Sequence, residues 1–178
     1  MAQDSPAQTL TFSEGTNSFE SFVSYHPENM CTLGNTLISF SGGDLYTHDS
    51  DTYNNFYGVQ YDSYIKFVFN DFPLQRKTFK SVEEISSILW DCPEITTNLN
   101  SYGVTKQLSN LVAGDFELLE SGWNASFLND INSIGGIING DNLKGFYMTV
   151  KFRAANPTEL VNLALCSVYF INSPLNSK

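Results

Sequence analysis

The sequence predicts a mainly β protein, an antiparallel β-sandwich or Greek-key-like domain with one or two short helices. Two segments, Tyr64–Asn70 and Phe146–Arg153, alternate apolar and other side chains as strands with one buried face do. Gly42 and Gly43 separate two short β-prone runs, a pattern typical of a hairpin. No long amphipathic helical pattern and no strand–helix alternation runs through the chain, so we expect packed antiparallel sheets.

The predicted organisation begins with an arm. Residues 1–16 are polar and weakly patterned, so we expect them to be flexible or ordered by a partner. Residues 17–178 are expected to form a single β-rich structural domain, with possible lobes at 17–80 and 81–178. The hairpin is expected within residues 36–47.

Two segments are ambiguous between strand and helix. Phe79–Ile85 can form a strand, but the apolar residues of 83–90 also have helical spacing. The same ambiguity holds for Val104–Val112. Leu160–Ile171 is different, because both of its alternating sets are largely apolar. A strand that is apolar on both faces is expected in the middle of a layered structure.

Composition and charge exclude several classes of protein. The chain has 178 residues, a net charge of −10 and only 16% charged residues, while 14% are aromatic. This acid excess argues against a nucleic-acid partner, since phosphate binding depends on Lys and Arg. No apolar run is long enough to span a membrane. Residues 1–65 contain eight acids and no Lys or Arg, so an assembly could place them against a basic surface.

The search for chemistry gives no catalytic residues, no metal site and no cofactor site. None of the common catalytic or nucleotide-binding motifs is present, and the chain has two histidines. His48 with Asp49 and Asp51 is the best local cluster, and a solvated loop explains it better than a Ca²⁺ site. The three cysteines lie far apart and lack CxxC spacing, which predicts neither zinc binding nor a disulfide framework. We therefore expect a protein that is not an enzyme.

Aromatic and amide side chains mark the candidate interface. Five aromatic residues crowd into twelve positions together with Asn54 and Asn55, and such groups serve sugar-binding platforms as well as protein–protein contacts. The five are Tyr53, Phe56, Tyr57, Tyr61 and Tyr64. Core packing and a turn would explain the same cluster. Trp123 is expected in the core or at a subunit contact. The acidic third could meet the cations Arg76, Lys77 and Lys80 of a neighbour. The candidate interface residues are Tyr53, Asn54, Asn55, Phe56, Tyr57, Trp123, Arg76 and Lys77.

The order of several short motifs resembles a known family. These motifs are Ser24–Glu28, Leu37–Phe40, Gly43–Tyr46 with His48, Tyr53–Gly58, Ile65–Asn70, Pro73, Lys77–Phe79, Trp123–Asp130, Asn139–Asp141 and Leu143–Gly145. Together with the last two predicted strands they resemble a segment of tail and muzzle proteins of crAss-like podoviruses that infect gut Bacteroides. The resemblance covers about residues 19–173, and no catalytic residues come with it.

The resemblance implies a structural component of a bacteriophage virion. The expected place is the tail, in the muzzle or tail-hub assembly, and the expected site of synthesis is the cytoplasm of the host bacterium. The expected partners are further copies of the chain and other virion proteins. One alternative remains open, a carbohydrate-binding or receptor-binding β-sandwich that recognises a host-surface glycan. A glycan-active enzyme would need a cleft with two converging carboxylates, which the sequence does not select.

Overall fold

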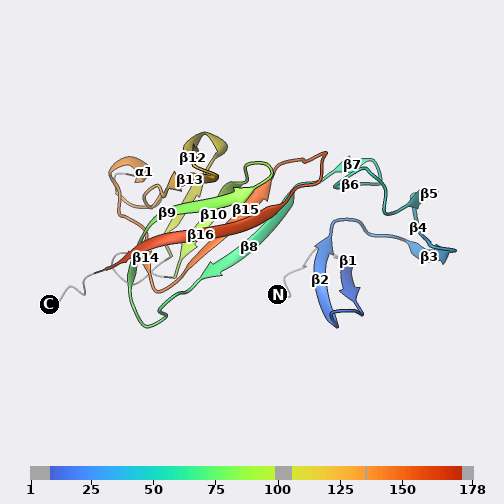
Figure 1. The fold of residues 1–178 in the computed structure, drawn as a ribbon, viewed down its shortest axis with the longest axis horizontal. Coiled ribbons are helices and arrows are strands. Elements are labelled where there is room, and N and C mark those ends of the chain that lie inside the picture. Colours follow the sequence, from blue (N-terminus) through green and yellow to red (C-terminus); the bar gives the residue numbers. More distant parts are fainter. Residues whose placement is uncertain (1–8, 99–105, 135, 174–178) are drawn as a thin grey trace. The chain divides into compact units, whose positions relative to one another are not determined.

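The computed structural model describes residues 9–98, 106–134 and 136–173, and nearly all of its elements are strands (Figure 1). The chain divides into two compact units. Unit 1 is the described part of Met1–Tyr61 together with Asn156–Glu159, and unit 2 is Asp62–Ala155 together with the described part of Leu160–Lys178. Among the described residues, no helix has the length and hydropathy that crossing a membrane requires.

Unit 1 consists of small antiparallel sheets. Its strands are β1 (Thr9–Ser13), β2 (Ser18–Val23), β3 (Asn29–Leu33), β4 (Thr36–Ser41), β5 (Asp44–Thr47), β6 (Asn55–Phe56) and β7 (Val59–Gln60). They form the pairs β1–β2 and β6–β7 and the three-stranded sheet β3–β4–β5. Part of the expected N-terminal arm is therefore a hairpin strand, while residues 1–8 of that arm lie outside the described residues.

The predicted Gly-Gly hairpin is confirmed by β4 and β5. The two strands pair antiparallel, with Ser41 opposite Asp44 next to the turn. Gly42 and Gly43 have φ angles of 62° and 90°. Both values lie in the left-handed region, which glycine adopts without a steric cost from Cβ. The turn therefore requires the residue type that the sequence places there.

Unit 2 is a sandwich of two sheets. Its strands are β8 (Ser63–Phe69), β9 (Lys77–Ser86), β10 (Asp91–Thr97), β11 (Leu108–Leu111), β12 (Glu117–Leu119), β13 (Gly122–Ser126), β14 (Lys144–Gly145), β15 (Met148–Ala154) and β16 (Leu163–Asn172). The first sheet has the order β11–β10–β15–β8. The second has the order β12–β13–β9–β14, and β16 also pairs with β9. Two short helical segments, the 3-10 turn η1 (Ala113–Asp115) and α1 (Gly136–Asn139), complete it.

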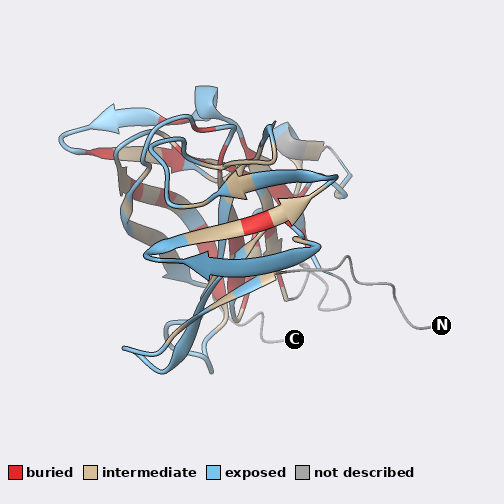
Figure 2. Cartoon of the chain, turned by 90° about the vertical axis from the view of Figure 1, so that its right-hand side faces the viewer, coloured by how far each residue is buried: buried red, intermediate tan, exposed pale blue. Residues whose placement is uncertain are grey.

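The core of unit 2 lies between these sheets. Strand β15 alternates strictly, with Met148, Val150 and Phe152 fully buried and the residues between them half-buried. These side chains pack with Phe79 and Val82 of β9 from the other sheet. Figure 2 shows buried residues gathered in the sandwich strands, whereas the strands of unit 1 are mostly intermediate or exposed. The predicted mainly β class and the alternating strands are confirmed.

The structure decides the two ambiguous segments in favour of strands. Glu83–Ser86 belongs to β9, so the helical interpretation of 83–90 is wrong there. Leu108–Leu111 forms β11, while residues 104 and 105 of the second segment lie outside the described residues. Both strands pair with neighbours in the sheets, and this tertiary pairing outweighs a weak local helical spacing. The possible lobe boundary between residues 80 and 81 falls inside β9.

The expectation for the last strand is wrong in one respect. β16 lies at the edge of its sheet, and within the described chain β9 is its only strand partner. Cys166, Val168 and Phe170 pack against the core, but Leu165, Tyr169 and Ile171 on the other face are exposed. Apolar residues on both faces therefore mark an exposed apolar surface here rather than a central position.

Candidate assembly interface

Residues 53–57 of unit 1, which we call the Tyr/Asn segment, are arranged around the buried side chain of Tyr25. The ring of Tyr25 lies 4.7 Å from that of His48, 4.9 Å from that of Phe56 and 5.8 Å from that of Tyr57, measured between centroids. Tyr46 contacts Tyr57 at 4.5 Å. We call these five side chains the aromatic cluster. Because they pack on one another, the cluster is the core of the small sheets in unit 1.

Hydrogen bonds fix the middle of the aromatic cluster. The Ser39 hydroxyl lies 2.6 Å from Nε2 of His48 and 2.8 Å from the hydroxyl of Tyr57. Burial raises the pKa of the neighbouring Tyr25, and the nearby Tyr57 adds to this rise. A Ser–His contact of this length resembles an activated nucleophile, but Ser39 is fully buried and out of reach of a substrate. The contact joins β4 to the segments that follow β5.

The structure separates the predicted interface residues of this segment into inner and outer ones. Phe56 and Tyr57 are half-buried in the aromatic cluster, while Tyr53 is 38% exposed. The amide of Asn55 donates to Gln60 Oε1 at 3.3 Å, and the carbonyl of Asn54 accepts from the Tyr61 N–H at 2.8 Å. These bonds close the loop on itself and leave Tyr53 as its most exposed aromatic residue.

Trp123 and the two predicted cations belong to unit 2. Trp123 lies on β13, opposite Leu118 and Glu84, and is half-buried against the core. Arg76 is half-buried just before β9. This position of Trp123 fits both expected roles, packing in the core and contact with another subunit.

Lys77, at the start of β9, is only 1% exposed. Its ammonium donates to the backbone carbonyls of Phe72 and Gln75, at 3.3 and 3.2 Å, and to that of Phe146. It also lies 5.5 Å from the ring centroid of Phe170. Burial lowers the pKa of Lys77 despite the opposing effect of Asp71. This lysine therefore crosslinks loops inside unit 2, and an intersubunit contact would have to use other cations.

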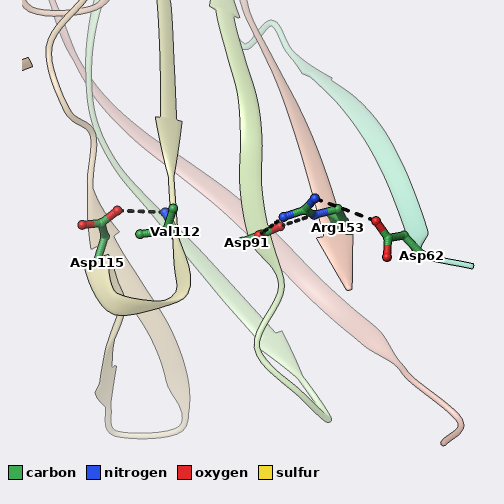
Figure 3. Close-up of polar contacts among 5 residues, drawn as sticks. All are labelled: Asp62, Asp91, Val112, Asp115 and Arg153. Carbon is green, nitrogen blue, oxygen red and sulfur yellow. Dashed lines mark hydrogen bonds and ion pairs between the residues drawn. The ribbon is translucent and has the colours of Figure 1, made fainter. Parts of the chain in front are cut away.

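The outer face of the first sheet carries opposite charges. Arg153 makes two hydrogen bonds with Asp91, from Nε at 3.0 Å and from a terminal nitrogen at 2.6 Å, and lies 3.8 Å from Asp62 (Figure 3). The bonds to Asp91 raise the pKa of Arg153. Lys66 pairs with Glu94 at 2.7 Å on the same face. This face is thus charged and internally paired.

A backbone cap lies close to these charges in unit 2. The Asp115 carboxylate accepts a hydrogen bond from the Val112 N–H at 2.8 Å, also drawn in Figure 3. This bond holds the turn η1 that follows β11. Among the residues that the structure describes, no group of three or more His, Cys, Asp or Glu side chains is placed to hold a metal ion.

Two exposed apolar surfaces were not singled out from the sequence. One is the outer face of β16, and the other is the face of the β1–β2 hairpin with Leu10, Phe12, Phe19 and Phe22. Phe12 and Phe19 contact each other edge to face at 5.2 Å, yet both are exposed. Exposed apolar patches commonly mark interaction sites. The sequence signal was present, since both segments carry large apolar residues.

Residues 51–130 match the family model of the Crassvirus muzzle protein C-terminal domain. This match confirms the resemblance to muzzle proteins of crAss-like phages. It begins at Asp51 in unit 1 and runs through β13 in unit 2. The muzzle family implies a tail-related structural role in the virion. No curated protein matches the chain.

Proposed function

We propose that the chain is a building part of the phage tail, in the muzzle or tail-hub assembly, and that it acts by binding copies of itself and other virion proteins. The match of residues 51–130 to the muzzle domain carries this proposal. The exposed apolar surfaces of β16 and of the β1–β2 hairpin support it. A structural part of this kind needs extended, complementary surfaces more than a catalytic cleft.

Tyr53, Asn54 and Asn55 are the part of the Tyr/Asn segment proposed to contact a neighbour, with Phe56 and Tyr57 supporting them from the aromatic cluster. The test is Tyr53→Ala in the full chain. Tyr147→Ala is the matched control, because both tyrosines are 38% exposed and Tyr147 lies outside the proposed contact. Weaker binding to virion proteins by the first variant alone would support the contact, and equal behaviour of both variants would contradict it.

The acidic N-terminal third is proposed to meet a basic surface of a neighbouring copy. Because Lys77 is buried, Arg76 and the exposed Lys80 are the cations proposed for this contact. Contacts between exposed charges weaken with salt, so Lys80→Glu is expected to reduce association most at low ionic strength. Lys106→Glu, at another exposed lysine, is the matched control. If both variants associate equally, this contact is excluded.

The carbohydrate-binding alternative gains less support from the geometry. A sugar platform would present several rings of the Tyr/Asn segment to solvent, but Phe56 and Tyr57 pack around Tyr25. Tyr53 and Tyr64 are exposed, at 38% and 59%. Binding of the purified chain to host-surface glycans, lost in Tyr53→Ala, would be needed to favour this alternative.

The proposed function is tested on phage particles. Particles purified through a density gradient and washed in high salt are expected to contain the chain, detected by mass spectrometry. Antibody labelling is expected at the tail rather than over the capsid. A chain that is abundant in the infected lysate but absent from washed particles would overturn the proposal.

A further inference from the structure

We propose that β16 is a docking strand that pairs antiparallel with β16 of a second copy of this chain. This inference deepens the proposed function and rests on it, because it names the partner and the surface of one assembly contact. It is carried by the position of β16 in its sheet, by the side chains of its exposed face and by the absence of charge along it.

β16 has one strand neighbour where a sheet strand has room for two. Residues 163–172 pair with residues 77–86 of β9, and β13 and β14 occupy the other edge of β9. In the described part of the chain no other strand pairs with β16. About every second residue of this ten-residue edge strand therefore turns its backbone N–H and C=O away from β9, and such a row of groups is a template for adding a strand.

The exposed side chains beside this edge are large and apolar. Leu165, Tyr169 and Ile171 point away from the core and are 46%, 51% and 55% exposed. Edge strands in soluble proteins usually carry charges or proline that prevent pairing. β16 has neither within Leu163–Asn172. An unprotected edge of this length is expected to be covered in the assembled protein.

Charge favours a second copy as the occupant. The chain carries −10, so most contacts between two copies would bring like charges together. β16 contains no charged residue, so its self-pairing brings no charged side chains of the two strands together. The nearest acid on that face, Glu83, accepts a hydrogen bond from the Tyr169 hydroxyl at 2.5 Å and belongs to the next strand. Two such acids would lie roughly 14 Å apart across the joined strands, beyond the screening length in salt.

The other edges of the sandwich fit a second copy less well. β8 carries Lys66, and β12 begins at Glu117 and has three residues. Self-pairing of β8 would bring two lysine-bearing strands together, and like charges on facing strands are destabilising. β11 is uncharged but only four residues long. β16 combines length with neutrality.

The pleat restricts the register of the pair. Opposite residues of antiparallel strands lie on the same face of the sheet. If the inner face and the outer face of the sheet are each to continue across the pair, one residue must therefore lie opposite the same residue of the second copy, at the two-fold axis. Centring on Val168 overlaps nearly the whole strand and places Leu165 opposite Ile171 of the second copy. It also places Ser167 opposite Tyr169. All these pairs are neutral, and the apolar residues of the outer face meet each other.

The first test measures the mass of the full chain in solution. The wild-type chain is expected to form dimers or larger assemblies, and the double variant Leu165→Lys with Ile171→Lys is expected to weaken self-association at least about tenfold. Leu119→Lys is the control, because Leu119 is 54% exposed on β12, outside the proposed contact. Circular dichroism and the melting temperature establish that each variant is folded.

The second test measures the register. In a background with Cys31→Ser, which removes the exposed cysteine, the pair Leu165→Cys and Ile171→Cys is expected to give a disulfide-linked dimer on oxidation. Leu165→Cys alone is the control, because in this register its two copies lie roughly 20 Å apart and cannot be bridged. Crosslinking by the control as efficiently as by the pair would overturn the register.

The outcomes separate this inference from the proposed function. A wild-type chain that remains monomeric at all accessible concentrations overturns β16 pairing, as does an assembly that both lysine substitutions leave intact. In either case the proposed function stands if the chain is found in washed particles. Absence from the particles overturns the proposed function, whatever the mass in solution.

Discussion

The carboxylate of Glu84 accepts a hydrogen bond from the backbone N–H of Trp90 at 2.8 Å inside the sandwich of unit 2. The same oxygen accepts from the Ser86 hydroxyl at 3.1 Å, and the side chain is fully buried. Burial raises the pKa of Glu84, and these two bonds oppose the rise without cancelling it. The protonated form is therefore favoured by folding.

The raised pKa of Glu84 makes stability depend on pH. Above the ordinary value of 4.5, the folded state binds more protons than the unfolded state until the raised pKa is passed. The free energy of unfolding thus falls as pH rises through that window. Glu84→Gln keeps the acceptor oxygen and is expected to lessen this fall, as measured by urea denaturation between pH 4 and 8. Glu83→Gln, on the outer face, is the control, and equal pH profiles of Glu84→Gln and wild type would contradict the prediction.

Removal of the Lys77 ammonium is expected to destabilise unit 2. Lys77→Met removes the ammonium donor from three backbone carbonyls, of which that of Phe72 still accepts from the Gln75 N–H at 2.9 Å. An acceptor left unpaired inside a protein costs about 1–3 kcal/mol. We expect a loss of at least about 2 kcal/mol in the free energy of unfolding. Lys80→Met, at an exposed position of the same strand, is expected to change it by less than about 0.5 kcal/mol. Similar losses in both variants would show that the carbonyl contacts contribute little.

The cost of removing a phenylalanine is expected to differ sharply between a buried and an exposed position. Phe152 is fully buried in β15, so Phe152→Ala should cost about 3–5 kcal/mol. Phe19 is 69% exposed in the β1–β2 hairpin, and Phe19→Ala should cost less than about 1 kcal/mol in the isolated chain. Chemical denaturation measures both. A large loss for Phe19→Ala would mean that the hairpin face is covered in solution.

Substitution in the β4–β5 turn is expected to loosen that hairpin. Gly43 has φ of 90°, so Gly43→Ala places a Cβ in an unfavourable backbone region and should cost roughly 1 kcal/mol or more. Gly114→Ala is the control, because Gly114 has ordinary φ and open space around it. Hydrogen exchange of the β4 and β5 amides is expected to accelerate only in the first variant. Unchanged exchange in Gly43→Ala would show that the turn adapts.

Local sequence patterns predicted the strands that bury one face and leave the other face less buried. The alternation in β15 follows from the pleat of a strand, and the two glycines between β4 and β5 follow from the backbone angles of the turn. Both features are therefore visible in the order of the residues. The position of β16 could not be read in this way, because an edge strand with an apolar outer face has the same pattern as a central one. The burial of the ionisable side chains of Lys77 and Glu84 was also missed. Their burial depends on carbonyls and N–H groups brought close by the fold, which no local pattern encodes.

Candidate interface residues were predicted less completely. The crowding of Tyr and Asn at 53–57 located a real cluster, but its centre is Tyr25, which lies far from it in the sequence. The sequence alone could not separate inner from outer rings, because exposure is set by the partner strands. Only Tyr53 of that segment is exposed enough to act as an anchor for a neighbour.

The assignment of Asn156–Glu159 to unit 1 has a practical consequence for dissecting the protein. The backbone passes from one unit to the other three times, after residues 61, 155 and 159. Within unit 1 the Gln60 amide donates to the Pro157 carbonyl at 2.6 Å. A fragment that starts at residue 62 would therefore contain residues 156–159 without the part of unit 1 that they pack with. After a single protease cut between residues 61 and 62, residues 156–159 of the C-terminal piece would still be bound to the N-terminal piece. Expression of unit 2 alone calls for replacing residues 156–159 with a short linker as well as removing the N-terminal segment.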